Sequence, residues 1–181
     1  MKKELLSNEE LELRETDSSK DVVNQLDSIY VDLDDLFLKE IPDFLSTVDR
    51  VQGYFSVTNN KLTSLKNSPR IITNSFYCSN NNIKNLVGGP KEVHENYNLH
   101  NNLELVSLEG ISEVIGEDLN ITSCYALVNF KYFPRIIGGD LEIGHYRGGN
   151  QMFPKEFDEK FFRSICDIGG NVTIFRYDVW G

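Results

Sequence analysis

The chain of 181 residues contains no long apolar run and no recognisable export leader. No stretch approaches the ~18 consecutive apolar residues that a membrane-spanning helix needs. The first residues are basic, but acidic residues follow before any apolar core, which is unlike a secretory signal. The sequence therefore predicts no association with a membrane and a cytoplasmic location.

Cysteine and histidine are scarce, at three residues each. The cysteines are odd in number and show no CxxC spacing, so reduced thiols are expected rather than disulfides. No histidine stands at metal-ligand spacing from another histidine or a cysteine. We therefore predict no catalytic residue, no metal site, no cofactor and a non-enzymatic protein. The residues concerned are Cys78, Cys124, Cys166, His94, His100 and His145.

The chain also lacks a phosphate-binding loop. Glycine pairs begin at Gly88, Gly138, Gly148 and Gly169, but none is followed by Lys and then Ser or Thr. Three of these pairs fall at turns of a repeat described below, where we expect glycine to supply unusual backbone angles.

Positive charge is sparse and unevenly placed. The net charge is −10, and residues 1–50 hold 14 acidic and 6 basic side chains, against 14 and 12 in the remainder. This balance argues against direct nucleic-acid binding through phosphate neutralisation. The acidic segment 1–50 supports an alternative function, a nucleic-acid mimic that occupies the basic groove of a DNA- or RNA-binding protein. An acidic segment can equally be a solubilising arm.

What the chain does contain is a tandem repeat, clearest in residues 53–90. Two rows of 21 residues align, so that Phe55 recurs as Phe76, Asn60 as Asn81 and Pro69 as Pro90. Two further rows follow with a step of 22 residues. The sequence Ile-Gly-Gly-Asp-Leu-Glu-Ile, which begins at Ile137, is then echoed 31 residues later, which indicates an insertion before the last row.

Each row resembles the leucine-rich repeat, in which two apolar strand residues precede an Asn or Cys and further apolar positions. The resemblance covers residues 41–143 and returns at 168–175, and the proline rows look like the short bacterial subtype. It implies an α/β solenoid with a parallel sheet of about six short strands. In such a fold the Asn or Cys side chains form a structural ladder that satisfies buried backbone groups. The ladder residues are Asn60, Asn81, Asn102 and Cys124.

Four segments follow from this interpretation. Residues 1–17 form an acidic N-terminal arm, and residues 18–52 a helical N-terminal cap that runs into a half repeat. Residues 53–144 form the solenoid, and residues 145–181 supply a helical insertion, the last strand and a C-terminal cap. Caps are required because a repeat stack exposes apolar surface and unpaired strand edges at both ends. The apolar positions with helical spacing in the first cap are Val22, Leu26, Ile29, Tyr30, Leu33 and Phe37.

Side chains of a strand alternate between two faces, so the neighbours of the buried positions line an open face. Solenoids commonly bind partners along such a concave surface, and we predict a protein-binding module of this kind. The predicted partner is a protein, and the style of the sequence suggests a phage or bacterial accessory protein that modulates a host protein in the host-cell cytoplasm. A structural or scaffold subunit is a third alternative. The predicted partner-binding residues are Tyr54, Ser56, Thr58, Tyr77, Ser79, Asn98, His100, Asp118, Asn120, Thr122, Asp140 and Glu142.

Overall fold

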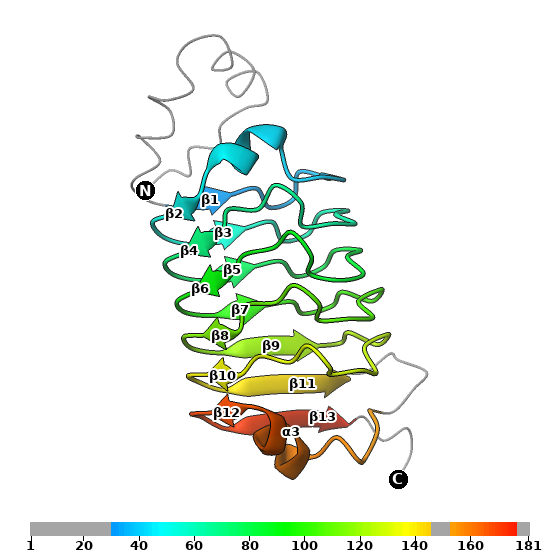
Figure 1. The fold of residues 1–181 in the computed structure, drawn as a ribbon. Coiled ribbons are helices and arrows are strands. Elements are labelled where there is room, and N and C mark those ends of the chain that lie inside the picture. Colours follow the sequence, from blue (N-terminus) through cyan, green and yellow to red (C-terminus); the bar gives the residue numbers. More distant parts are fainter. Residues whose placement is uncertain (1–29, 146–152, 177–181) are drawn as a thin grey trace, which may run out of the picture.

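The computed structural model describes residues 30–145 and 153–176 and shows a parallel β-solenoid (Figure 1). The chain passes once per turn through each of two parallel sheets, and successive turns stack along one axis. Sheet A contains β1 (Val31–Asp32), β3 (Phe55–Ser56), β5 (Phe76–Tyr77), β7 (Tyr97–Asn98), β9 (Leu119–Thr122), β11 (Leu141–His145) and β13 (Val172–Arg176). Sheet B contains β2 (Arg50–Val51), β4 (Ile71–Ile72), β6 (Glu92–Val93), β8 (Val114–Ile115), β10 (Ile136–Ile137) and β12 (Asp167–Ile168).

The prediction of stacked parallel strands is confirmed, but the prediction of a single sheet of about six strands is wrong. The apolar residue ahead of each predicted strand belongs to a strand of its own, as in the pairing of Val51 with Ile72. The bend between the two strands is also bonded from row to row, because Thr73 N donates to Val51 O at 3.1 Å. Two short segments of each row therefore form backbone hydrogen bonds with the next row, and two sheets result.

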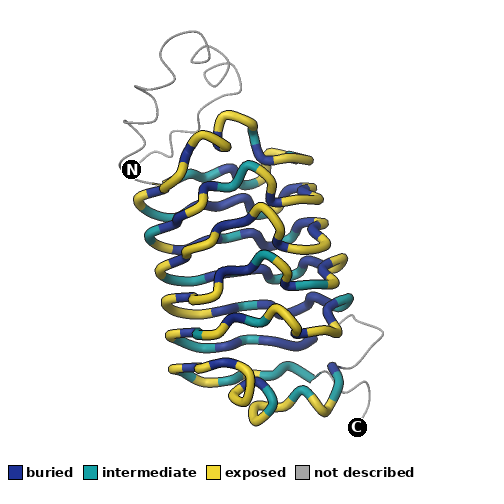
Figure 2. Tube along the Cα trace, viewed as in Figure 1, coloured by how far each residue is buried: buried dark blue, intermediate teal, exposed yellow. Residues whose placement is uncertain are grey.

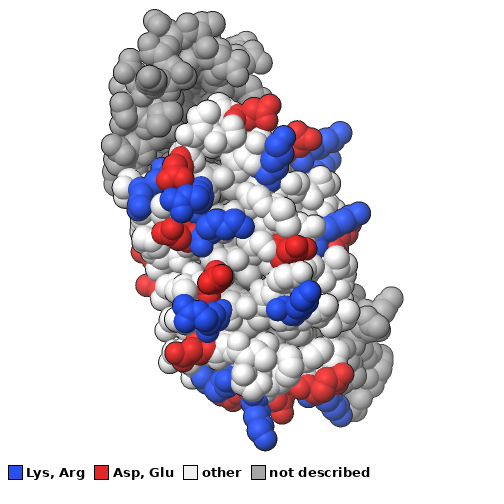
Figure 3. Space-filling model, viewed as in Figure 1, with Lys and Arg blue, Asp and Glu red and all other residues white. Residues whose placement is uncertain are grey.

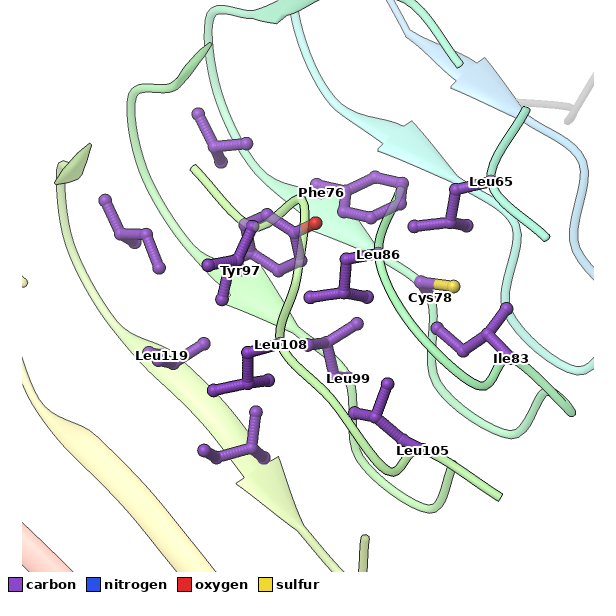
Figure 4. Packing of buried hydrophobic residues seen from close by; sticks show 14 of the residues in the cluster. Leu65, Phe76, Cys78, Ile83, Leu86, Tyr97, Leu99, Leu105, Leu108 and Leu119 are labelled. Carbon is purple, nitrogen blue, oxygen red and sulfur yellow. The ribbon is translucent and has the colours of Figure 1, made fainter. Parts of the chain in front are cut away.

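The core lies inside the coil, between the two sheets on one side and the connecting segments that carry Leu65, Leu86 and Leu108 on the other, and it repeats from row to row (Figures 2 and 4). Phe55 and Val57 are fully buried, as predicted from strand alternation. The aromatic rings of successive rows contact one another, with 5.7 Å between the centroids of Phe55 and Phe76 and 5.0 Å between those of Phe76 and Tyr97. Stacking of like side chains on like side chains gives the solenoid one continuous core.

Tyr97 places a hydroxyl in this core without a hydrogen-bond partner within the described residues. Burial raises the pKa of the Tyr97 phenol well above its usual value. An unsatisfied buried hydroxyl costs about 1–3 kcal/mol, so Tyr97→Phe is expected to raise the free energy of unfolding by about 1 kcal/mol. Thermal melting followed by circular dichroism would measure the change. A lower melting temperature in Tyr97→Phe would show that the hydroxyl does have a stabilising partner.

The start of the described chain is a strand rather than the predicted helix. Residues 30–37 contain β1 and a turn in which Asp35 and Phe37 adopt positive φ values of 60° and 56°. Val31 N donates to Tyr54 O at 2.9 Å, and Leu33 N donates to Ser56 O at 2.9 Å. Pairing of this segment satisfies the backbone of β3, and that gain outweighs the helical spacing of its apolar residues.

Residues 41–51 form the expected half repeat with one shift of register. The 3₁₀ helix η1 (Asp43–Thr47) buries Leu45, whereas Phe44, which the spacing of the repeat aligns with Leu65, is 36% exposed. The predictions for residues 1–29, and for closure of the C-terminal end by residues 177–181, lie outside the described residues.

The predicted helix in the insertion is confirmed as α3 (Glu159–Ile165), and β13 supplies the predicted last strand. Asp158 caps the helix by accepting a bond from Phe161 N at 2.8 Å. Arg163 ties the helix to the last row, since its Nη1 and Nη2 donate to Ile168 O and Gly170 O, both at 2.8 Å. The phenylalanines of the insertion pack on Phe130 and cover the end of the core.

The glycine pairs are needed more because the backbones of adjacent rows lie close together than because glycine adopts unusual backbone angles. Gly88 has the positive φ that was predicted, at 85°. Gly138 and Gly169 do not, and a Cβ atom there would overlap the carbonyl oxygens of Gly116 and Gly138. At these rows the neighbouring backbones lie too close together for a side chain.

Candidate binding face

The outward side chains of sheet A, here called the sheet A face, stand in straight columns. The strand register places Tyr77, Asn98, Asn120 and Glu142 in line, one per row. Neighbouring strands of a sheet are about 4.8 Å apart, so each column is a ladder of side chains with that spacing. The sheet A face comprises Tyr30, Asp32, Asp34, Tyr54, Ser56, Thr58, Ser75, Tyr77, Ser79, Asn96, Asn98, His100, Asp118, Asn120, Thr122, Asp140, Glu142, Gly144, Asn171, Thr173 and Phe175.

Three tyrosines form a stripe over the first rows of the sheet A face. Tyr30 stacks on Tyr54 with 5.0 Å between ring centroids, and Tyr54 meets Tyr77 edge-on at 6.1 Å. Tyr30 is 51% exposed, whereas Tyr54 and Tyr77 are half-buried. Rings held by their neighbours in this way lose little conformational entropy when a partner binds.

A hydrogen-bond network holds the polar side chains of the central rows. Thr122 N donates to Asn120 Oδ1 at 3.0 Å, which fixes the orientation of that amide and directs its Nδ2 to Glu142 Oε2 at 2.6 Å. The Thr122 hydroxyl also donates to Asn120 Oδ1, at 2.6 Å, and lies 2.7 Å from His100 Nδ1. His100 therefore carries its proton on Nδ1 and donates it to Thr122.

His100 is neutral at physiological pH. Burial lowers the pKa of the His100 imidazole, and this effect outweighs the opposing attraction of Glu142. The ring lies in a shallow polar hollow between the tyrosine stripe and the last rows. The hollow is lined by Ser79, Asn80, Asn98, His100, Asn101, Asn120, Thr122, Ser123 and Tyr125.

The aspartates of the later rows combine a charge with a structural bond. Asp118 Oδ1 accepts a hydrogen bond from Asp140 N, and Asp140 Oδ1 accepts one from Asn171 N, both at 2.7 Å. Asn96 occupies the same column and accepts from Asp118 N at 3.1 Å. An asparagine can therefore fill this position without loss of the row-to-row bond.

Three of the predicted partner-binding residues are buried. Ser56, Ser79 and Thr122 are 4%, 9% and 0% exposed. The Ser56 hydroxyl donates to Asp34 Oδ1 at 2.6 Å, and the Ser79 hydroxyl donates to Asn98 Oδ1 at 2.8 Å. These hydroxyls position the side chains beside them. The other nine predicted residues are exposed or half-buried on the sheet A face: Tyr54, Thr58, Tyr77, Asn98, His100, Asp118, Asn120, Asp140 and Glu142.

The predicted ladder residues lie inside the turn that follows each strand of sheet A. Asn81 Nδ2 donates to Val57 O in the preceding row at 2.9 Å, and Asn81 Oδ1 accepts from Leu62 N at 3.0 Å. Asn60 and Asn102 make the same kind of bond to the preceding row, at 2.8 and 2.9 Å. Cys124 Sγ lies 3.4 Å from Leu99 O in the fourth rung.

A second asparagine ladder runs beside the first and was not predicted. Asn59, Asn80 and Asn101 each adopt a positive φ near 55–60°. Asn80 Nδ2 donates to Asn59 Oδ1 at 2.7 Å, and Asn101 Nδ2 donates to Asn80 Oδ1 at 2.6 Å. The signal in the sequence is the Asn-Asn pair in three successive rows, since asparagine tolerates the left-handed conformation better than most residues.

Charge is segregated between the sheet A face and the rest of the described surface. The residues of the sheet A face include five carboxylates, Asp32, Asp34, Asp118, Asp140 and Glu142, and neither Lys nor Arg. The view in Figure 3 shows basic and acidic side chains interspersed over another part of the surface. Strand alternation predicted the acidic groups of the later rows on this face. It did not predict those of the first row, because Asp32 and Asp34 fall in the segment predicted to be a helix.

The three cysteines are buried thiols. Burial raises the pKa of Cys124 to about 12 and that of Cys166 to about 11, with Asp167 adding to the shift at Cys166. The pKa of Cys78 is raised further by the same cause. All three are therefore protonated at neutral pH, and a protonated thiol is a poor nucleophile.

Neither a membrane-spanning helix nor a metal-binding cluster is found within the described ranges. No helix there is both long and apolar enough to cross a membrane. Residues 30–145 and 153–176 contain no group of three His, Cys, Asp or Glu side chains arranged to hold a metal ion.

Comparison of the chain with protein-family models, curated proteins and solved structures gave no match in any of the three. The functional argument therefore rests on the residues of the sheet A face.

Proposed function

We propose that this protein is a non-enzymatic binding module of the leucine-rich-repeat kind, which captures a protein partner on the sheet A face. The observation that carries the proposal is the combination of exposed aromatic rings and polar groups on a surface held by row-to-row hydrogen bonds. Within this proposal the protein is a small cytoplasmic accessory protein of a bacterium or phage, and its partner is a host protein.

The tyrosine stripe is the strongest argument for a partner. Tyrosine is enriched where protein interfaces concentrate their binding energy, because it adds a large contact area and a polar end at low entropic cost. Tyr54 and Tyr77 lie on adjacent strands and face away from the core. Such a cross-strand pair stabilises the sheet by about 0.2–1 kcal/mol, and the ring surface left open to solvent offers contact area to a partner.

The central rows add preorganised polar groups. Asn98 accepts a hydrogen bond from Ser79 of a neighbouring row, while Asn120 and His100 are bonded to Glu142 and Thr122 of the next row. Side chains already ordered before binding lose less conformational entropy in the complex, which favours affinity. The sheet A face therefore offers aromatic anchors beside a rigid polar hollow.

The test is capture of a partner from a bacterial lysate by immobilised protein, followed by variants of the stripe. Tyr54→Ala with Tyr77→Ala is expected to reduce capture at least about tenfold, since interface tyrosines commonly contribute hot-spot energies. Tyr132→Ala is the matched control, because Tyr132 is 40% exposed but lies outside sheet A. Equal capture by the stripe variant and the control would refute the proposed face.

The nucleic-acid mimic remains the competing proposal. It is distinguished by the residues and the salt concentration on which partner capture depends. Of the acidic segment 1–50, the described part includes Asp32, Asp34 and Asp35 close together in the first row, and burial raises the pKa of Asp34. A mimic would lose its partner when Asp32, Asp34 and Asp35 are changed to Asn, and would keep it in the Tyr54→Ala, Tyr77→Ala variant. Its complex would also dissociate as salt is raised, because its contacts would be charges at the surface.

A further inference from the structure

We propose that the sheet A face binds an extended cationic polypeptide segment that runs along the solenoid axis, across the strands. One Lys or Arg side chain of this segment lies at Asp118, Asp140 and Glu142, and another lies over Tyr54 and Tyr77. This inference rests on the proposed function and names the chemistry of its partner.

The first argument concerns the charge of the acidic groups in the later rows, Asp118, Asp140 and Glu142. Arg70 pairs with Asp49 at 2.8 Å and with Glu92 at 3.1 Å, and Arg163 pairs with Glu159 at 2.8 Å. None of these ion pairs involves Asp118, Asp140 or Glu142. The basic side chains of these pairs thus neutralise acidic groups elsewhere, while no Lys or Arg of the described residues pairs with Asp118, Asp140 or Glu142.

These three carboxylates are also held in place. Asp118 and Asp140 each use one oxygen to accept a backbone N–H of the next row, and Glu142 accepts from Asn120. Each carboxylate has a second oxygen, which a Lys ammonium or an Arg guanidinium from a partner can bind. A partner rich in phosphate would be repelled by the same groups, so the occupant is cationic.

The tyrosine stripe suits a second cation. A Lys or Arg side chain within about 6 Å of an aromatic ring is attracted by its π face. Tyr54 and Tyr77 are in edge-on contact, with 6.1 Å between centroids and an interplanar angle of 67°, so a cation lies over the outer surface of the pair. The protein itself uses this contact elsewhere, where Lys61 Nζ lies 5.4 Å from the ring centroid of Phe37.

The strand register sets the distance between the two cations. Tyr77 and Glu142 are in one column and three strand steps apart, through Asn98 and Asn120. Three steps of about 4.8 Å give about 14 Å, which an extended chain covers in about four residues at roughly 3.4 Å each. Side chains at i and i+4 of an extended chain point to the same side, so both reach the sheet A face.

The polar hollow lies under the intervening residues of the bound segment. Asn98 Oδ1 accepts from the Ser79 hydroxyl at 2.8 Å and from His100 N at 3.0 Å. No hydrogen bond within the described residues uses Asn98 Nδ2, which can therefore donate to a carbonyl of the segment. A segment with small residues between its two cations fits this surface.

The test measures binding of two fluorescent seven-residue peptides of Arg, Gly and Ser with one composition, at low ionic strength. One peptide has arginine at its second and sixth positions, and the other has two adjacent arginines in its centre. The separated arrangement is expected to bind about threefold more tightly, because only it reaches both the tyrosine stripe and the acidic groups of the later rows. Equal affinity of the two peptides would overturn the axial placement.

Charge is tested by the triple variant Asp118→Asn, Asp140→Asn, Glu142→Gln, which keeps every row-to-row hydrogen-bond acceptor. It is expected to weaken the separated peptide about tenfold, by loss of three negative charges near one arginine. The matched control is Glu109→Gln, Glu113→Gln, Glu156→Gln, which removes the same net charge at exposed positions off sheet A. Binding equally weakened by both triples would show that net charge alone attracts the peptide.

The result also separates this inference from the proposed function. If capture of the protein partner depends on Tyr54 and Tyr77 but the acidic triple variant binds the peptide unchanged, the binding face stands and the cationic occupant is wrong. If the tyrosine variant captures the partner normally, the proposed face itself is wrong. Circular dichroism of each variant confirms that the solenoid is intact.

Discussion

Replacing Asn81 by alanine is expected to lower the free energy of unfolding by about 3 kcal/mol, because it leaves a buried N–H unpaired and opens a cavity. Leu62 is fully buried, and the Asn81 Oδ1 atom accepts its N–H at 3.0 Å. The same side chain donates to Val57 O in the preceding row, so it joins two turns of the solenoid. The substitution therefore weakens the contact between rows as well as the turn itself.

The measurement is the midpoint of thermal unfolding, followed by far-ultraviolet circular dichroism. A loss of about 3 kcal/mol corresponds to a decrease of roughly 6–12 °C for a chain of this size. Asn82→Ala is the matched control, since Asn82 is exposed and its side chain donates to Glu104 at 3.3 Å, while its backbone bond to Leu62 O is kept, so a change within about 0.5 kcal/mol is expected. Similar melting of the two variants would contradict the structural role assigned to Asn81.

Gly138→Ala is expected to destabilise the protein by about 3 kcal/mol, because its Cβ atom would overlap the neighbouring backbone. The overlapping atom is the carbonyl oxygen of Gly116, which belongs to the adjacent row and cannot rotate away like a side chain. Gly138 N also donates to Ile115 O at 2.9 Å. Relief of the overlap would lengthen this bond and separate β8 from β10.

His94→Ala provides the control for Gly138→Ala, because His94 stands in the same column two rows earlier and already carries a Cβ atom. Its side chain is half exposed, and its Nε2 lies 3.9 Å from Glu92. Urea unfolding monitored by circular dichroism is expected to show a lower midpoint for Gly138→Ala and an unchanged midpoint for His94→Ala. An unchanged Gly138→Ala midpoint would mean that the rows can separate at no cost.

Several features could be predicted from the sequence because they depend on side-chain direction within one row. The 21-residue echo predicts stacked parallel strands, and strand alternation predicts that Phe55 and Val57 are buried. The lost pattern after Ile143 and the phenylalanines that follow predict the helix now seen as α3. Each of these inferences uses neighbours in sequence, whose geometry is set by local backbone conformation.

The candidate site was predictable in outline but not in detail. Alternation places Tyr77, Asn98 and Glu142 on the open face, and these side chains are half-buried there. It does not reveal that Thr122 is fully buried, since its hydroxyl is held by Asn120 of its own row and lies against His100 of the preceding row. Burial on a sheet face is decided by the size of side chains in adjacent rows, which lie about 21 residues apart.

What the sequence by itself determined is therefore the period, the inward positions and the helix of the insertion. Only the tertiary structure decided that the rows form two sheets, that residues 31–32 are a strand, and that Gly138 is required for close approach. All three depend on how near one row lies to the next, a distance set by backbone pairing between segments far apart in the chain. The same pairing aligns Tyr77 with Glu142 and so gives the sheet A face its proposed spacing.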